Sequence, residues 1–365
     1  MTDGRPPSSR STPPPVTVGD AAPRAQNRVL IPTHGRMPRK PASELIWDFR
    51  GETMGTSWSV RLIPPPELGR VLFQDEIEHE LAAVVALFSH WDETSELSRF
   101  NAAPEGFYEV SEPFWALLDA SLDLADATYG AVDPTLGALV DLWGFGPPGP
   151  RPLDSFGKNP TAPYETEIKA AQAVSGWLKL RLNREARAVQ QMGGLKLDFS
   201  GIAKGYAVDR VSDRLTALGA HSHVVEVGGE MRGAGVKWDG HPWWAELEQA
   251  PGAPGGRTVA ALFDMAVATS GDWVRTYEVY GQAYSHTIDG RTGRPINNGV
   301  ASVTVLAETA MRADALATAL AVMGPEEGLA FANYVGLAAA IVVRGEDGLT
   351  EIVSSAFQAM LDEGE

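Results

Sequence analysis

The chain has 365 residues, of which 44% are hydrophobic, so it is long enough to bury a large core. Its formal net charge of −17 argues against a general nucleic-acid-binding protein, because contact with a phosphate backbone needs a basic surface. The absence of cysteine excludes disulfides, thiolate metal ligands, a cysteine nucleophile and a lipid anchor on cysteine. No apolar run approaches the ~20 residues of a membrane-spanning helix, so no integral membrane segment is expected.

Residues 1–43 differ in composition from the rest of the chain. They hold seven of the 30 Lys and Arg residues, two of the 47 Asp and Glu residues and nine of the 26 prolines. This composition is typical of a disordered leader, and a plain flexible leader is favoured over a docking arm. Because no apolar segment of a secretory signal is visible, the sequence predicts a cytoplasmic protein.

An ordered domain is expected over residues 44–350, followed by a C-terminal tail over residues 351–365. Its periodic segments predict strands at 56–62, 223–227, 243–248, 259–263, 284–288, 302–306 and 339–343. They predict helices at about 72–88, 113–129 and 310–323, and a Pro/Gly-rich loop at 144–163. The mixture of antiparallel-looking strands and helices indicates the α+β class.

The stretch over residues 197–206 is the most informative part of the chain. The apolar residues before it alternate as in a half-buried strand, and those after it recur at helical spacing. Between them lie Asp198, a Ser-Gly turn and Lys204, which falls in the first turn of the predicted helix. Helix-terminal amides and a lysine both favour an anion, so this turn is a candidate phosphate site.

The predicted helix at 310–323 carries Asp314 and Thr318, which are four residues apart and share one face. A carboxylate and a hydroxyl one turn apart suit a hard cation such as Mg²⁺, which leaves room for substrate phosphates. The alternative is a surface Asp and a Thr that bonds back to its own helix. The flanking Ala and Leu residues predict a helix buried on most sides, where a lone Asp is costly without a cation. Both interpretations stay open.

His286 lies at the end of a predicted strand, before an acid and a glycine-rich turn. It could accept a proton near neutral pH, or it could be a structural histidine. Segments 130–137 and 142–146 place Asp133 and aromatic residues beside turns, which suits an aromatic ring system and ordinary turn packing equally. No segment matches a P-loop or a GxGxxG fingerprint, which argues against a nucleoside-triphosphate or nicotinamide enzyme.

Taken together, these and other short segments resemble the motifs of the ApbE family, the FAD:protein FMN transferases. Each segment alone is a weak match, but their order and spacing from about residue 51 to residue 324 are highly specific. The matching segments are 53–56, 95–101, 130–135, 142–146, 198–205, 227–230, 269–272, 285–289, 291–293 and 313–318.

The resemblance implies a two-lobed, T-fold-like α+β architecture with mixed or antiparallel sheets and flanking helices. It implies that FAD lies in the cleft between the lobes and that Mg²⁺ holds its pyrophosphate. The implied FAD contacts are Met54, Ala131, Val132, Asp133, Asp198, Lys204 and Ile288. The implied metal ligands are the backbone carbonyl of Gly201 and the side chains of Asp314 and Thr318, and His286 falls where the family places a histidine associated with transfer.

The implied reaction is attack by a threonine hydroxyl of an acceptor flavoprotein on the FMN-side phosphorus of FAD, with release of AMP. A threonine hydroxyl is a poor nucleophile near neutral pH, so His286 is a candidate base. The alternatives are an Mg²⁺-dependent FAD pyrophosphatase, which uses water instead of threonine, and a non-catalytic FAD-binding protein. A flavin redox enzyme is least favoured, because the assembled groups address phosphate rather than the flavin ring.

Overall fold

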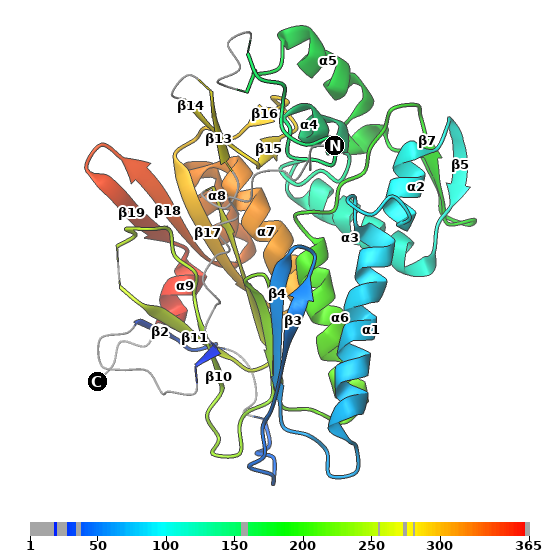
Figure 1. The fold of residues 1–365 in the computed structure, drawn as a ribbon. Coiled ribbons are helices and arrows are strands. Elements are labelled where there is room, and N and C mark those ends of the chain that lie inside the picture. Colours follow the sequence, from blue (N-terminus) through cyan, green and yellow to red (C-terminus); the bar gives the residue numbers. More distant parts are fainter. Residues whose placement is uncertain are drawn as a thin grey trace, which may run out of the picture.

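The computed structural model describes residues 18–19, 28–33, 38–154, 160–254, 256–272, 276–279 and 282–361. Most of the predicted leader, residues 1–43, lies outside the described residues. A central antiparallel sheet separates a layer of helices from a smaller sheet (Figure 1). The predicted α+β class is confirmed.

The central sheet has the strand order β19-β18-β17-β12-β9-β8-β4-β3, and all neighbouring strands are antiparallel. Every residue of β8 and β17 is buried, as expected for strands covered on both faces. The strands are β3 (Trp47–Thr53), β4 (Thr56–Leu62), β8 (His223–Val227), β9 (Glu230–Ala234), β12 (Met265–Gly271), β17 (Val300–Ala307), β18 (Ala338–Gly345) and β19 (Gly348–Val353).

One face of this sheet is covered by α1 (Arg70–Phe88), α6 (Ala203–Ala217), α7 (Ala310–Met323) and α8 (Pro325–Val335). Helix α7 packs on β12, β17 and α6, and α1 packs on α6 and β3. Smaller elements extend the helical side: α2 (Glu96–Ala102), α3 (Glu112–Ala127), α4 (Gly137–Leu142), α5 (Glu165–Val174), the short 3₁₀ helix η1 (Trp177–Lys179), β5 (Gly106–Glu109), β6 (Leu182–Asn183) and β7 (Ala188–Gln191).

The other face carries a second apolar core that includes Trp243, Leu262 and Phe357. A sheet of order β1-β10-β11-β2 and helix α9 (Ser355–Met360) contribute to this layer. Its strands are β1 (Val18–Gly19), β2 (Arg28–Leu30), β10 (Trp243–Glu246) and β11 (Thr258–Leu262). Short pieces of the predicted leader and of the predicted tail therefore belong to this layer.

The prediction of one strand over residues 284–288 is wrong. The structure has β14 (Gln282–Ser285), paired with β13 (Thr276–Val279), and separately β15 (Ile288–Asp289), paired with β16 (Arg294–Pro295). The Ser285 hydroxyl accepts a hydrogen bond of 3.3 Å from the Thr287 amide. Such a local bond offers the backbone an alternative to the sheet and turns the chain between the two strands.

A buried histidine links α6 to β8. His223 is fully buried, with Nδ1 2.7 Å from the carbonyl of Ala220 and Nε2 2.8 Å from the hydroxyl of Ser212. Because a carbonyl can only accept, Nδ1 carries the proton and Nε2 accepts from Ser212. Burial disfavours the charged ring and lowers the pKa of His223 to about 4.

We expect this histidine to destabilise the fold as the pH falls from 6.5 to 4. In that range the unfolded chain, whose histidine has a pKa near 6.5, binds a proton that the folded protein excludes. Full stability is present above pH 6.5, and the loss reaches about 3 kcal/mol near pH 4. In chemical denaturation across this pH range, the free energy of unfolding should depend less steeply on pH for His223→Asn than for the wild type. Parallel pH dependences for the two proteins would contradict this assignment.

Candidate functional site

Met54 lies in the tight turn between β3 and β4. Met54 and Gly55 have φ of 50° and 75°, as a two-residue hairpin with the twist of its strands requires. The amide of Gly228, in the turn between β8 and β9, donates to the Ser57 carbonyl at 3.0 Å. The Met54 turn therefore lies beside the turn that leads into Glu230.

Asp198 joins two of the segments singled out in the sequence. Its amide donates to the Pro134 carbonyl at 2.9 Å, which places it beside the 130–135 segment. Its Oδ1 accepts from the Ser200 amide at 2.7 Å, and its Oδ2 lies 3.7 Å from Nδ1 of His90. The side chain is 9% exposed, so the turn before α6 holds this carboxylate in one orientation.

Asp133 stabilises its own turn. Oδ1 accepts from the amide and hydroxyl of Thr135, and Oδ2 accepts from the Trp177 amide at 3.2 Å. Burial raises the pKa of Asp133, although these hydrogen bonds act in the opposite direction. These contacts correspond to the ordinary turn packing, so FAD contact by Ala131, Val132 and Asp133 stays a prediction.

Ile288 packs against the segment that follows Asp133. It shares a buried cluster with Leu136, Leu139, Trp143 and Ile168. A Cβ added at Gly290 would lie 2.9 Å from Leu136 and 3.7 Å from Oδ2 of Asp133. The structure thus brings the 285–293 segment against the 131–136 segment, as a common role for Ile288 and Asp133 requires.

The three residues implied as metal ligands lie together where α6 begins against α7. A Cβ at Gly201 would lie 3.2 Å from Oγ1 of Thr318, and the Gly205 amide donates to Oδ2 of Asp314 at 3.0 Å. Thr318 also bonds back to the Asp314 carbonyl at 3.3 Å, so that part of the structural interpretation is confirmed. The surface position for Asp314 is wrong, because this residue is only 4% exposed in a helix buried on most sides.

Lys204, in the first turn of α6, pairs with Glu230 at the start of β9. Its Nζ lies 2.5 Å from Oε1 of Glu230. Burial alone would lower the pKa of Lys204, but the charges of Glu230 and Asp314 outweigh it and raise the pKa. Burial likewise raises the pKa of Asp314 and brings that of Glu230 to about 8, against the opposing charge of Lys204. The lysine is therefore held as a cation at the helix N-terminus.

The donor chemistry of this cluster fits a small hard cation. Gly201 offers a carbonyl, Thr318 a hydroxyl and Asp314 a carboxylate, and Mg²⁺ is usually bound by one or two carboxylates together with substrate phosphates. Among the described residues, no group of three or more His, Cys, Asp or Glu side chains has metal-binding geometry. The predicted set contains one such side chain, that of Asp314, and its other two ligands are a hydroxyl and a backbone carbonyl.

His286 is half-buried between β14 and β15, with its ring 6.4 Å from the Phe145 ring in an edge-to-face arrangement. The next residue, Thr287, lines a small cavity together with Ser270 and Ala321. The Ser270 hydroxyl lies 3.3 Å from Oγ1 of Thr318. The His286 segment is therefore connected to the Thr318 cluster through β12.

Two acidic residues that sequence reasoning left without a role flank the Gly228–Gly229 turn. Glu226 accepts from the Gly229 amide at 3.0 Å and from the Ser59 hydroxyl at 3.1 Å, so it stabilises the turn. Glu230 pairs with Lys204, as described above. In the sequence, both stand out only as acids on either side of a glycine pair. That pattern does not show which residue each carboxylate contacts.

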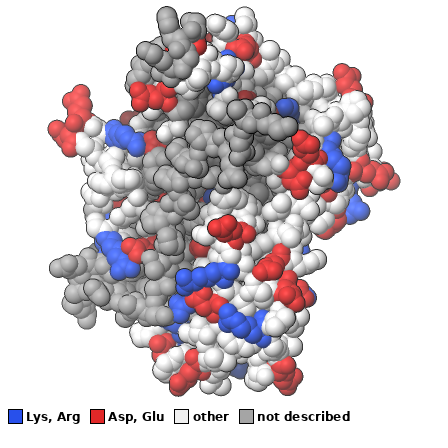
Figure 2. All heavy atoms as spheres, viewed as in Figure 1, with Lys and Arg blue, Asp and Glu red and all other residues white. Residues whose placement is uncertain are grey.

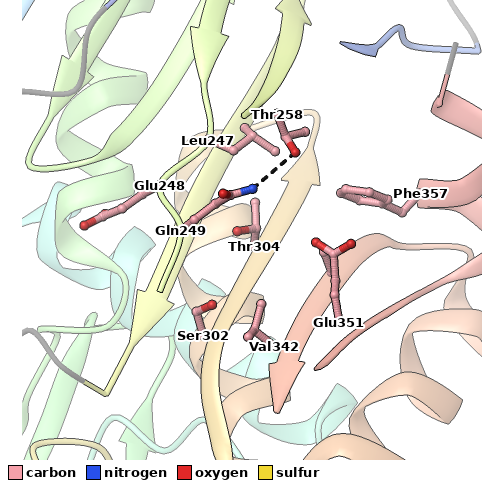
Figure 3. A pocket seen from close by; sticks show the side chains of 10 residues that line it. Leu247, Glu248, Gln249, Thr258, Ser302, Thr304, Val342, Glu351 and Phe357 are labelled. Atoms are coloured by element: carbon pink, nitrogen blue, oxygen red, sulfur yellow. Dashed lines mark hydrogen bonds between the residues drawn. The ribbon is translucent and has the colours of Figure 1, made fainter. Parts of the chain in front are cut away.

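A second small cavity lies between the two sheets and is separate from these residues (Figure 3). Thr304, Val342, Glu351 and Phe357 line it, and Gln249 donates to the Thr258 hydroxyl across one wall. None of the predicted site residues lines this cavity, so we do not assign it to the predicted site.

On the face in Figure 2, Lys and Arg side chains lie beside Asp and Glu side chains instead of forming a continuous positive area. In the part of the chain that the structure describes, no helix has the length and apolar character needed to cross a bilayer.

Comparison with known proteins places these features in a family. The model of the ApbE family matches residues 54–341. The FAD:protein FMN transferase of Vibrio cholerae is 38% identical over 332 residues, which cover 88% of this chain and 94% of the relative. The FAD:protein FMN transferase of Haemophilus influenzae is 36% identical over 320 residues, which cover 86% and 90% of the two chains.

Solved structures agree with the sequence comparison. The apo crystal structure of Pseudomonas stutzeri flavinyl transferase ApbE has a TM-score of 0.79 at 36% identity, covering 88% of this chain and 98% of that one. The ApbE protein of Thermotoga maritima has a TM-score of 0.76 at 30% identity, covering 87% and 100%. The expected fold class is therefore confirmed.

Proposed function

The chain belongs to the ApbE family, and on that premise we propose that it transfers FMN from FAD to a threonine hydroxyl of an acceptor flavoprotein. The observation that carries this proposal is the meeting of Gly201, Asp314 and Thr318 beside Lys204. These groups are suited to bind a pyrophosphate and its counter-ion, which a reaction at the phosphorus of FAD requires.

Gly201, Asp314 and Thr318 would hold Mg²⁺, which when bound neutralises charge on the phosphates. The α6 N-terminus and Lys204 act in the same direction, because both present positive charge to an anion. Met54, the 131–133 segment and Ile288 would bind and orient the rest of FAD, while Asp198 holds the turn before α6. Orientation of the reacting groups lowers the barrier further.

The proposed function is tested by co-expressing the protein with candidate acceptor flavoproteins and measuring their masses. The expected result is a mass gain equal to FMN on one threonine, with stoichiometric AMP. The FAD pyrophosphatase alternative is separated by incubation with FAD and Mg²⁺ in the absence of acceptor, where fast, sustained AMP release would favour hydrolysis. Retention of FAD without AMP release under either condition would favour a non-catalytic binding protein.

His286→Ala is expected to slow flavin transfer about a hundredfold, the lower part of the usual range for general-base catalysis. The physical reason is that His286 would take the proton from the attacking threonine hydroxyl. Single-turnover transfer to the acceptor measures this rate, and FAD binding measured separately should change little. A rate within about threefold of wild type would exclude His286 as the base.

A further inference from the structure

Lys204 is outnumbered by carboxylates. Glu230 pairs with it directly, and the charges of Asp314 and Glu248 also act on it. Conversely, the charge of Lys204 stabilises the ionised forms of all three acids. Lys204 also acts on Glu226, so one ammonium lies among four acidic side chains at the position where the pyrophosphate of FAD is proposed to bind.

Glu230 is the most constrained of these acids. Its side chain is 2% exposed, and its Oε2 has no hydrogen-bond partner among the described residues. A buried carboxylate with an unpaired oxygen opposes folding, so its retention needs a reason beyond stability. The Lys204 side chain is 34% exposed, which leaves its outer side accessible to a ligand while Glu230 holds it from within.

Glu248 approaches the same turn from the loop after β10. Glu248 is also one of the residues that line the cavity between the two sheets (Figure 3). Its Oε2 lies 3.2 Å from the position of a Cβ on Gly229, the residue before Glu230. Glu230 and Glu248 therefore place negative charge on both sides of the Gly228–Gly229 turn.

We propose that Glu230, acting through Lys204, makes FAD binding dependent on a divalent cation. This inference rests on the proposed function. When Glu230 is ionised, above its pKa of about 8, and no cation is bound, the dianionic pyrophosphate meets an excess of carboxylates and a lysine whose positive charge is offset by Glu230. With the cation, the added double positive charge offsets this excess, and pyrophosphate binding becomes favourable. Glu230 is a positioning residue in this scheme, because it acts through Lys204 and does not touch the reacting atoms.

The test is calorimetric titration of the full chain with FAD, in EDTA and in saturating Mg²⁺. Work at about pH 8.5 keeps Glu230 ionised, since burial raises its pKa to about 8. In Glu230→Gln, which preserves side-chain shape, metal-free FAD affinity should rise about tenfold while Mg²⁺-loaded affinity changes less than about threefold. The ratio of metal-free to Mg²⁺-loaded dissociation constants should therefore fall to about a tenth of the wild-type ratio.

The matched control is Glu80→Gln, which changes another buried glutamate, paired with Arg210 at 2.7 Å on the α1–α6 interface. Its affinity ratio should equal that of the wild type. Glu248→Gln is a second test variant at a partly exposed position and should lower the ratio in the same direction by about threefold. It keeps the proposal testable if Glu230→Gln does not fold.

Ratios within about twofold of wild type in Glu230→Gln, or in Glu248→Gln if the first variant does not fold, would overturn the coupling. Equal changes in metal-free and Mg²⁺-loaded affinity would overturn it as well. A wild-type protein that does not bind FAD even in Mg²⁺ would overturn the proposed function and this inference together. A wild-type protein that binds FAD equally tightly in EDTA and in Mg²⁺ would overturn only the inference.

Discussion

Asp314→Asn is expected to reduce flavin transfer about a thousandfold, equivalent to about 4 kcal/mol of transition-state stabilisation. The carboxylate of Asp314 is the charged side chain among the proposed Mg²⁺ ligands, and its loss weakens neutralisation of the reacting phosphates. The Gly205 amide donates a hydrogen bond of 3.0 Å to the Asp314 carboxylate. Asparagine has nearly the same shape as aspartate and keeps an oxygen that can accept this bond. Asp314→Ala would instead leave that buried amide unpaired and mix a folding defect with a catalytic one.

The measurement is the rate of AMP release with acceptor across an Mg²⁺ titration, together with thermal unfolding of each protein. The matched control is Asp213→Asn on α6, where the side chain is 71% exposed and pairs with Arg232 at 3.1 Å. This control should retain wild-type rates. An Asp314→Asn rate within about tenfold of wild type would contradict the assignment of Asp314 to the metal.

Gly205→Ala is expected to lower the free energy of unfolding by about 3 kcal/mol or more. A Cβ at this position would lie 2.2 Å from the Ala310 carbonyl oxygen and 2.6 Å from the Met311 amide nitrogen. Both are backbone atoms at the start of α7, so the steric clash can be relieved only if α6 and α7 move apart. Separation would also weaken two hydrogen bonds from the Ala310 and Met311 amides to Asp209, each 2.9 Å.

Thermal or denaturant unfolding measures this effect directly. The matched control is Gly69→Ala, since Gly69 precedes α1 with φ of −86° and has no atom within 4 Å of an added Cβ. Its stability should fall by about 1 kcal/mol or less, because alanine is a poorer N-cap than glycine but meets no clash. Equal stabilities of the two variants would show that the α6–α7 contact tolerates a methyl group.

The sequence predicts local structure well where one pattern extends over several turns or a whole strand. The helix at 310–323 and the strand at 56–62 match α7 and β4 from end to end. The Ala and Leu residues around Asp314 also correctly predict its burial. In these segments, burial on the sheet reinforces what local periodicity already favours.

Contacts between distant segments are less accessible from sequence. The Lys204–Glu230 pair depends on how β9 lies against α6, and no local pattern specifies that packing. The strands β1 and β2 arise from a Pro-rich segment because β10 and β11 supply their hydrogen bonds. For the candidate site, motif order indicated Gly201, Asp314 and Thr318, whereas spacing alone left ordinary structural roles equally open.

The strand order of the central sheet has a consequence for synthesis of the chain. Strand β4 ends at Leu62, but its other neighbour, β8, begins at His223. At roughly 5–20 residues per second, a ribosome needs about 8–32 s to make the intervening segment. During that interval the inner edge of the β3–β4 hairpin has no partner strand, and only the earlier helices are available to cover its apolar face. Until β8 emerges, the nascent chain therefore carries an unpaired strand edge at which another chain could pair and start aggregation.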